Sequence, residues 1–226
     1  MCRVTVGFPC MALAQDAEMS FNEYETFVFN ACLLNWQNLS KTLDKIKSYF
    51  KKDSTVHLIG ENIDLKMKVK GHLAKADKGE ENMPGGEVFM APIKETVEGW
   101  VKFDYPSIRS SKEVCDIYLK FKQGKVVQHS ASKNAAFLSR MLYIDENASY
   151  VGELGIGCNP KITKYTKNLL FDEKISGKIH IALGAAYKEN WGGNDSALHW
   201  DLVKDMKKAN IIVDGKIIQE KGIWKI

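Results

Sequence analysis

The chain has 226 residues, a formal charge of +4, and 45% hydrophobic and 27% charged residues, a composition typical of a soluble globular protein that can bury a core. Lysines and arginines are spread along the chain, which argues against a nucleic-acid-binding stripe, and no apolar run is long enough to predict a membrane-spanning helix. Five cysteines without a CxxC pair indicate reduced thiols, and we expect a cytoplasmic protein.

The first fifty residues predict helices. Ser20 and Glu23 have the spacing of a capping box, and apolar residues follow them at helical intervals. A second helix is expected over 39–50, with its lysines facing outward. Residues 1–54 are therefore predicted to form a short helical segment.

From residue 55 onward, β-branched and aromatic residues alternate with polar ones, which predicts strands. The pair Asp214–Gly215 lies between apolar runs and indicates a hairpin turn. One helix, over about 133–145, is expected to interrupt the strands. The predicted fold class is α+β, with the helical segment followed by a β-rich metal-binding catalytic domain over 55–226.

Four stretches carry acidic, histidine or tyrosine residues among glycines and small apolar residues. They are NMPGGEVFMAP, YVGELGIGCNP, LFDEKISGKIHIALGAAY and LHWDLV. A buried carboxylate in such surroundings is costly unless it is paired or coordinated. The residues of interest are Glu87, Glu153, Glu173, His180, Tyr187, His199 and Asp201.

Their chemistry favours a pair of metal ions. Four carboxylates brought together would be neutralised by two divalent cations, and without cations some would take up protons. Oxygen and nitrogen ligands without a thiolate suit Zn, Co, Mn or Mg. His199 and Asp201 are two positions apart, so on a strand both point to one face. Two adjacent ions can share and activate one water molecule.

Other chemistries have less support. GELGIG lacks the spacing of a phosphate-binding loop, and the sequence contains neither HExxH nor GxSxG. The same two ions could hydrolyse phosphate esters, but only Lys174 and Lys178 lie near the motifs to hold a phosphate. His57, His72 and His129 fall in predicted strands or turns and are expected to be structural.

The strings NMPGGEVFMAP, GELGIGCNP, LFDEKISGKIHIALGAAY, GGNDSALHWDLVKDM and DGKII resemble the aminopeptidase T and aminopeptidase S family of dinuclear metallopeptidases. The resemblance implies an exopeptidase acting on peptides with a free N-terminus, and a homodimer. It implies that Glu87, Glu153, His180, Tyr187, His199 and Asp201 surround two metal ions, with Glu173 as a weaker addition. Tyr187 would be a ligand or an oxyanion donor, and Glu153, before Glu87, would bridge the ions.

Family members carry an additional N-terminal domain about as long as this chain, and we expect that domain to be absent here. The resemblance thus implies a metal-dependent aminopeptidase that releases N-terminal residues through a water activated by two metal ions. The alternative is a metal-binding relative that lacks peptidase activity because the N-terminal domain is missing.

Overall fold

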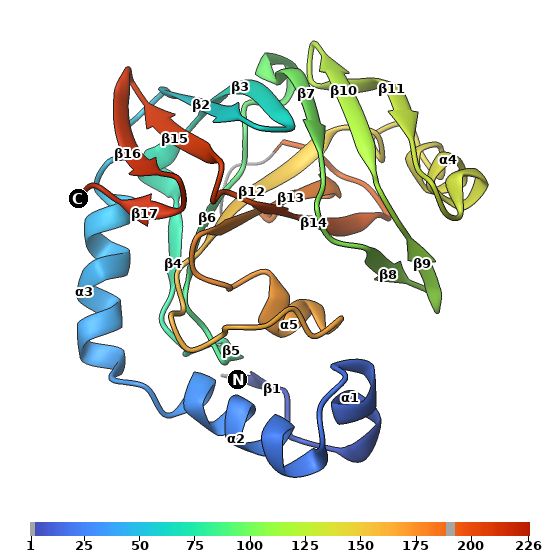
Figure 1. Cartoon of the computed structure of the whole chain (residues 1–226). Helices are drawn as coiled ribbons and strands as arrows, with labels where there is room; N and C mark the ends of the chain where they lie inside the picture. The colour runs from blue at the N-terminus through green and yellow to red at the C-terminus, as the bar shows by residue number, and fades with distance from the viewer. Residues whose placement is uncertain (1–2, 189–192) are drawn as a thin grey trace.

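The computed structural model describes residues 3–188 and 193–226, and it has the expected α+β fold. Helices dominate the early part of the chain, and strands follow them (Figure 1). Short 3₁₀ turns occur over Gly71–Leu73 and Lys94–Thr96. The helices are α1 (Met11–Asp16), α2 (Phe21–Cys32), α3 (Trp36–Lys47), α4 (Ala135–Leu142) and α5 (Leu169–Asp172).

A five-stranded antiparallel sheet occupies the middle of the molecule (Figure 1). Its spatial order is β14-β13-β12-β6-β4, so strands distant in sequence become neighbours. The strands are β4 (Lys75–Asp77), β6 (Glu87–Met90), β12 (Val151–Gly157), β13 (Lys178–Gly184) and β14 (His199–Asp205).

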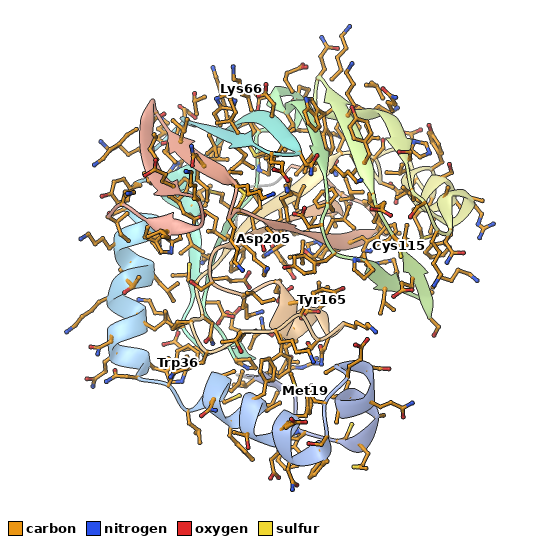
Figure 2. All side chains as sticks on the ribbon, in the orientation of Figure 1. Met19, Trp36, Lys66, Cys115, Tyr165 and Asp205 are labelled. Atoms are coloured by element: carbon orange, nitrogen blue, oxygen red, sulfur yellow. The ribbon has the colours of Figure 1, made fainter. Side chains whose placement is uncertain are left out.

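An eight-stranded antiparallel sheet has the order β11-β10-β7-β3-β2-β15-β16-β17. Along β3, buried and exposed residues alternate as the sequence predicts, and Lys66 points outward (Figure 2). The predicted Asp214–Gly215 hairpin joins β15 to β16. The strands are β2 (Ser54–Gly60), β3 (Ile63–Val69), β7 (Glu98–Lys102), β10 (Tyr118–Lys122), β11 (Lys125–Ser130), β15 (Ala209–Val213), β16 (Lys216–Glu220) and β17 (Ile223–Trp224).

Two short strand pairs complete the described fold. β8 (Ser107–Arg109) pairs with β9 (Lys112–Val114). β1 (Thr5–Val6) pairs in parallel with β5 (Asn82–Met83), so the segment expected to be helical also contains a strand. Local periodicity could not predict β1, because a two-residue strand depends on its distant partner.

The N-terminal helices confirm the predicted start signal. Ser20 and Glu23 form a complete capping box at α2. α3 begins at Trp36, earlier than expected, because the side chain of Asn35 accepts a hydrogen bond from the Asn38 amide and caps the helix. Within the described residues, no helix is both long and apolar enough to cross a membrane.

The two large sheets share one hydrophobic core. Leu154 and Ile181 of the five-stranded sheet belong to the same cluster as Leu58 of the eight-stranded sheet, and Leu43 of α3 joins them. One face of the five-stranded sheet therefore packs into this shared core. The division at residues 54 and 55 stays a prediction, since α3 shares this core.

A second hydrophobic cluster connects α1 and α2 to the chain around α5. Tyr24 and Phe27 of α2 pack against Phe171 and Ile175. The α5 region consequently lies between the N-terminal helices and the five-stranded sheet (Figure 1). This packing fixes the backbone on either side of Glu173.

Candidate metal centre

Five predicted ligands lie on the face of the five-stranded sheet opposite its packed face. Residues paired directly across antiparallel strands share a face, as do residues two apart along a strand. Ala182 pairs with both Glu153 and Asp201, so those two carboxylates flank a small side chain. The five come from four neighbouring strands: Glu87 on β6, Glu153 on β12, His180 on β13, and His199 and Asp201 on β14.

Gly155 provides the space in which the ligands meet. It pairs with His180 across β12 and β13, and the imidazole lies directly over its Cα atom. A Cβ atom at residue 155 would overlap the imidazole ring. Glycine is required here because the strand must leave room for a side chain of its neighbour.

The Nε2 atom of His180 lies among three carboxylates. It is 3.0 Å from Glu153 Oε1, 3.5 Å from Glu87 Oε2 and 3.8 Å from Asp201 Oδ1. His199 approaches from the other side, with its Nε2 atom 3.5 Å from Asp201 Oδ2. Both histidines therefore face the same group of oxygens.

The backbone orients the two imidazoles in the same way. His180 Nδ1 lies 3.2 Å from the carbonyl oxygen of Glu173, and His199 Nδ1 lies 2.8 Å from that of Ala185. A carbonyl only accepts hydrogen bonds, so each Nδ1 carries the donating proton. Once Nε2 has lost its proton it can bind a cation, which is the arrangement typical of metal-binding histidines.

Unsatisfied oxygens show that the donor set fits a cation. Glu87 Oε2 and Asp201 Oδ1 are buried and have no hydrogen-bond partner within the described part of the chain. Two groups of atoms close enough to hold an ion are present, Glu153 with His199 and Asp201, and Glu173 with His180 and Asp201. Glu87 lies outside both groups but contacts His180.

The protonation states reflect the crowding of carboxylates. Burial raises the pKa of Glu87 to about 8. Burial opposes protonation of His180, but the hydrogen bond to Glu153 and the charges of Glu87 and Asp201 outweigh it and raise the pKa to about 10. Asp201 likewise raises the pKa of His199 to about 9 against the effect of burial. Without a cation, protons on these groups compensate the negative charge.

We expect metal-free protein to lose more than about 1.4 kcal/mol of unfolding free energy between pH 6.5 and 9.5, the equivalent of one pKa unit. The folded pKa values of His180, His199 and Glu87 lie above their unfolded values, so the folded state binds more protons and stability falls as pH rises. Urea unfolding of the protein after its metal has been removed by a chelator measures the unfolding free energy at each pH. Stabilisation by added metal should instead grow with pH, because the ligands must lose protons. Rising stability of the metal-free protein over this range would contradict the assignment.

Sequence reasoning missed the role of Lys174, which it considered only as a phosphate clamp. The Lys174 side chain is fully buried, with its Nζ atom 3.3 Å from Glu87 Oε1 and in contact with Glu173 Oε1. Glu173 therefore already has a cationic partner. Lys178 is similarly engaged, 2.8 Å from Asp205 Oδ2.

Tyr187 lies beside the group of ligands. Its ring centroid is 5.2 Å from that of His199 and 6.0 Å from that of Phe89. Burial and the charges of Glu153 and Asp201 raise the pKa of the phenol well above its usual value. The protonated hydroxyl is suited to donating a hydrogen bond.

The sheet face that carries the predicted ligands opens into a cavity of about 980 Å³. Glu87, Glu153, Tyr187 and Asp201 line its inner wall. Asp77 of β4 also lines it and was missed by sequence reasoning, because the charged stretch around it is typical of a solvated turn. Only the pairing of β4 with β6 places Asp77 beside Glu87.

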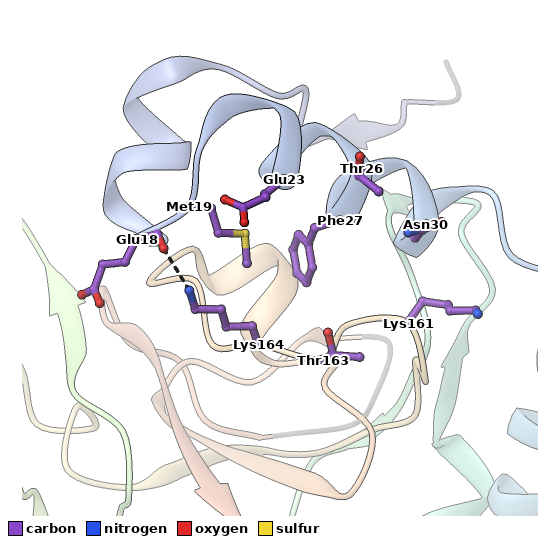
Figure 3. A pocket seen from close by; sticks show the side chains of 9 residues that line it. All are labelled: Glu18, Met19, Glu23, Thr26, Phe27, Asn30, Lys161, Thr163 and Lys164. Atoms are coloured by element: carbon purple, nitrogen blue, oxygen red, sulfur yellow. Dashed lines mark hydrogen bonds between the residues drawn. The ribbon is translucent and has the colours of Figure 1, made fainter.

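Other candidates do not join this site. His57 Nε2 is hydrogen-bonded to Asp64 Oδ1 at 2.8 Å, and His129 Nε2 to Ser139 Oγ at 2.6 Å. Both contacts agree with structural roles. A separate hollow of about 540 Å³ lies between α2 and the loop around Lys164 (Figure 3). The Lys164 ammonium there donates to the Glu18 carbonyl at 3.1 Å, so its charged end is already engaged.

Comparisons with known proteins find relatives in sequence and in structure. Aminopeptidase T of Thermus thermophilus is 30% identical over 223 residues, covering 84% of this chain and 54% of the relative. The solved structure of wild-type AmpT from Thermus thermophilus has a TM-score of 0.79 and 26% identity, covering 91% of this chain and 59% of that one.

A 2,5-dihydroxypyridine dioxygenase from Pseudomonas putida has a TM-score of 0.70 at 15% identity, covering 87% of this chain and 62% of that chain. This likeness concerns the fold alone, and function must be argued from the site. The chain spans about half the length of the curated relative it matches. The family model described as thermophilic metalloprotease (M29) matches residues 3–224, and the chain therefore belongs to that family.

Proposed function

We propose that the chain is a metal-dependent aminopeptidase that removes N-terminal residues from peptides with a free amino group. The observation that carries this is the convergence of Glu87, Glu153, His180, His199 and Asp201 on one sheet face, with orphaned carboxylate oxygens beside a cavity. Relatives named aminopeptidases support it.

Two divalent ions, Zn, Co, Mn or Mg, would be held by these five residues, with Glu173 as a further ligand. Bound there, the ions would polarise the peptide carbonyl and activate the attacking water. Glu153 is proposed to bridge, since one of its oxygens lies 3.0 Å from His180 and the residue also groups with His199. Glu87 is the second choice for bridging.

Tyr187 and Lys174 are proposed to assist the reaction without holding the ions. Tyr187 is proposed to donate a hydrogen bond to the oxygen on which negative charge develops. The water loses a proton as its oxygen bonds to the carbonyl carbon, the C–N bond breaks, and the departing amine takes up that proton. Lys174 holds Glu87 and Glu173 in place from the buried side of the site.

A two-metal phosphoesterase has less support. Lys174 and Lys178, the two lysines considered for a phosphate, are both engaged by carboxylates. A metal-binding relative without peptidase activity is the alternative that the test below addresses. A cytoplasmic location and a homodimer are proposed from the sequence, with no nucleic-acid or membrane partner.

The test combines metal content with peptide cleavage. After chelation and reloading with each metal, we expect about two ions per chain and release of N-terminal residues from a panel of dipeptides. The same peptides with an acetylated N-terminus should not be cleaved, and p-nitrophenyl phosphate should stay intact. Folded, metal-loaded protein that cleaves no peptide in the panel would instead support a metal-binding role without peptidase activity.

A further inference from the structure

Asp77 lies beside the proposed metal ligands at the edge of the five-stranded sheet. It pairs directly with Glu87 across β4 and β6, so the two side chains share a face. Directly opposed residues in antiparallel strands have Cβ atoms about 4.5–5.5 Å apart. Asp77 lines the large cavity and yet is only 8% exposed.

The Asp77 carboxylate is fixed through one oxygen and unpaired at the other. Oδ1 accepts a hydrogen bond from the Gly79 amide at 3.0 Å, and the Asp77 carbonyl accepts one from the Gly86 amide at 2.9 Å. Oδ2 is buried and has no hydrogen-bond partner within residues 3–188 and 193–226. An unpaired buried carboxylate oxygen is costly, and none of the described residues pairs with this atom, so Oδ2 is available to accept a hydrogen bond from a bound molecule.

The surroundings of Asp77 favour an ammonium group as that partner. Lys174 is the nearby buried cation, but its Nζ atom contacts Glu87 and Glu173. Asp77 belongs to neither group of atoms that could hold a metal ion. An ammonium group supplies positive charge and an N–H donor to Asp77 Oδ2, and unlike a metal ion it does not need several ligand atoms arranged around it.

We propose that Asp77 binds the α-ammonium group of the first residue of the peptide substrate, an inference that rests on the proposed aminopeptidase function. The α-nitrogen is separated from the scissile carbonyl carbon by one Cα atom, through bonds of about 1.46 and 1.52 Å. A residue that recognises it must therefore adjoin the ligands that hold that carbonyl. Asp77 does so, whereas the other acidic residues lining the cavity from this segment, Glu80 and Glu81, are exposed.

The experiment compares Asp77→Asn with Glu80→Gln in the full, metal-loaded chain. Asparagine keeps an Oδ1 acceptor for Gly79, removes the negative charge and replaces the unpaired Oδ2 acceptor with an NH2 donor, at nearly the same size. On a panel of aminoacyl p-nitroanilides we expect the KM of D77N to rise by about 10–100-fold, with kcat within about threefold and unchanged metal content. E80Q should stay within about twofold of the unmodified protein, and thermal unfolding checks that both variants fold.

An unchanged KM in D77N, or loss of metal from it, would overturn the inference while leaving the aminopeptidase function intact. If the unmodified protein cleaves no substrate, the proposed function fails instead, and a binding measurement decides on Asp77. Leucinol carries an α-ammonium group and 4-methylpentan-1-ol is the same molecule without it. Calorimetry should show tighter leucinol binding that D77N abolishes, and equal binding of leucinol by both proteins would reject the inference.

Discussion

Replacing Glu153 with glutamine is expected to lower peptide turnover by at least about 1,000-fold, equivalent to about 4 kcal/mol of transition-state stabilisation. Glu153 is 5% exposed and its Oε1 atom lies 3.0 Å from His180 Nε2. Glutamine keeps the size of the side chain but removes one negative charge from the centre of the ligands. Metal content should fall below two ions per chain, as measured by elemental analysis alongside turnover.

Glu146→Gln is the matched control for Glu153→Gln. Glu146 is exposed and lies seven positions earlier in the chain, and its replacement by glutamine removes the same charge. Its turnover and metal content should equal those of the unmodified protein. Full metal content and full turnover in E153Q would exclude Glu153 from the site and leave Glu87 as the proposed bridging residue.

Local sequence patterns predicted the parts of the fold that depend on near neighbours. The capping box of Ser20 and Glu23 and the turn at Asp214–Gly215 each use residues a few positions apart, and both were confirmed. The period-2 spacing of His199 and Asp201 correctly placed both on one face of a strand. These signals are local because they arise from backbone geometry.

The environment of the site could not be predicted in the same way. Asp77 and Lys174 adjoin Glu87 only because β4 pairs with β6 and the α5 region folds back over the sheet. Strand order and register depend on contacts between distant segments, and no local pattern specifies them. A lysine in a sequence also gives no indication that it will be fully buried, as Lys174 is.

The buried Lys174 changes the charge balance inferred from the sequence. Four carboxylates alone would balance two divalent ions, but Lys174 adds a fixed positive charge that contacts Glu173 and Glu87. Asp77 adds a fifth carboxylate on the same face. With both included, five negative charges would balance the five positive charges of the lysine and the two proposed divalent ions.

Gly155→Ala is expected to reduce turnover by about 100-fold or more, because a misplacement of about 1 Å at a catalytic site can cost that much. β12 is held between β6 and β13, so its backbone cannot retreat from an added methyl group. The imidazole of His180 must move instead, since a Cβ atom at residue 155 would overlap it. Displacement of Nε2 from Glu153 and Glu87 should also lower metal content.

A loss of stability alone could imitate this result, and Gly215→Ala separates the two effects. Gly215 has a φ of +81° in the β15–β16 turn, and a Cβ atom there would meet nothing within 4 Å. Alanine at that position strains the backbone and costs about 1 kcal/mol without touching the site. If G155A and G215A lose similar stability but only G155A loses turnover, the methyl group acts through His180. Equal turnover in both variants would mean that the imidazole can leave its place over Gly155 without consequence, and that the five ligands do not work as one site.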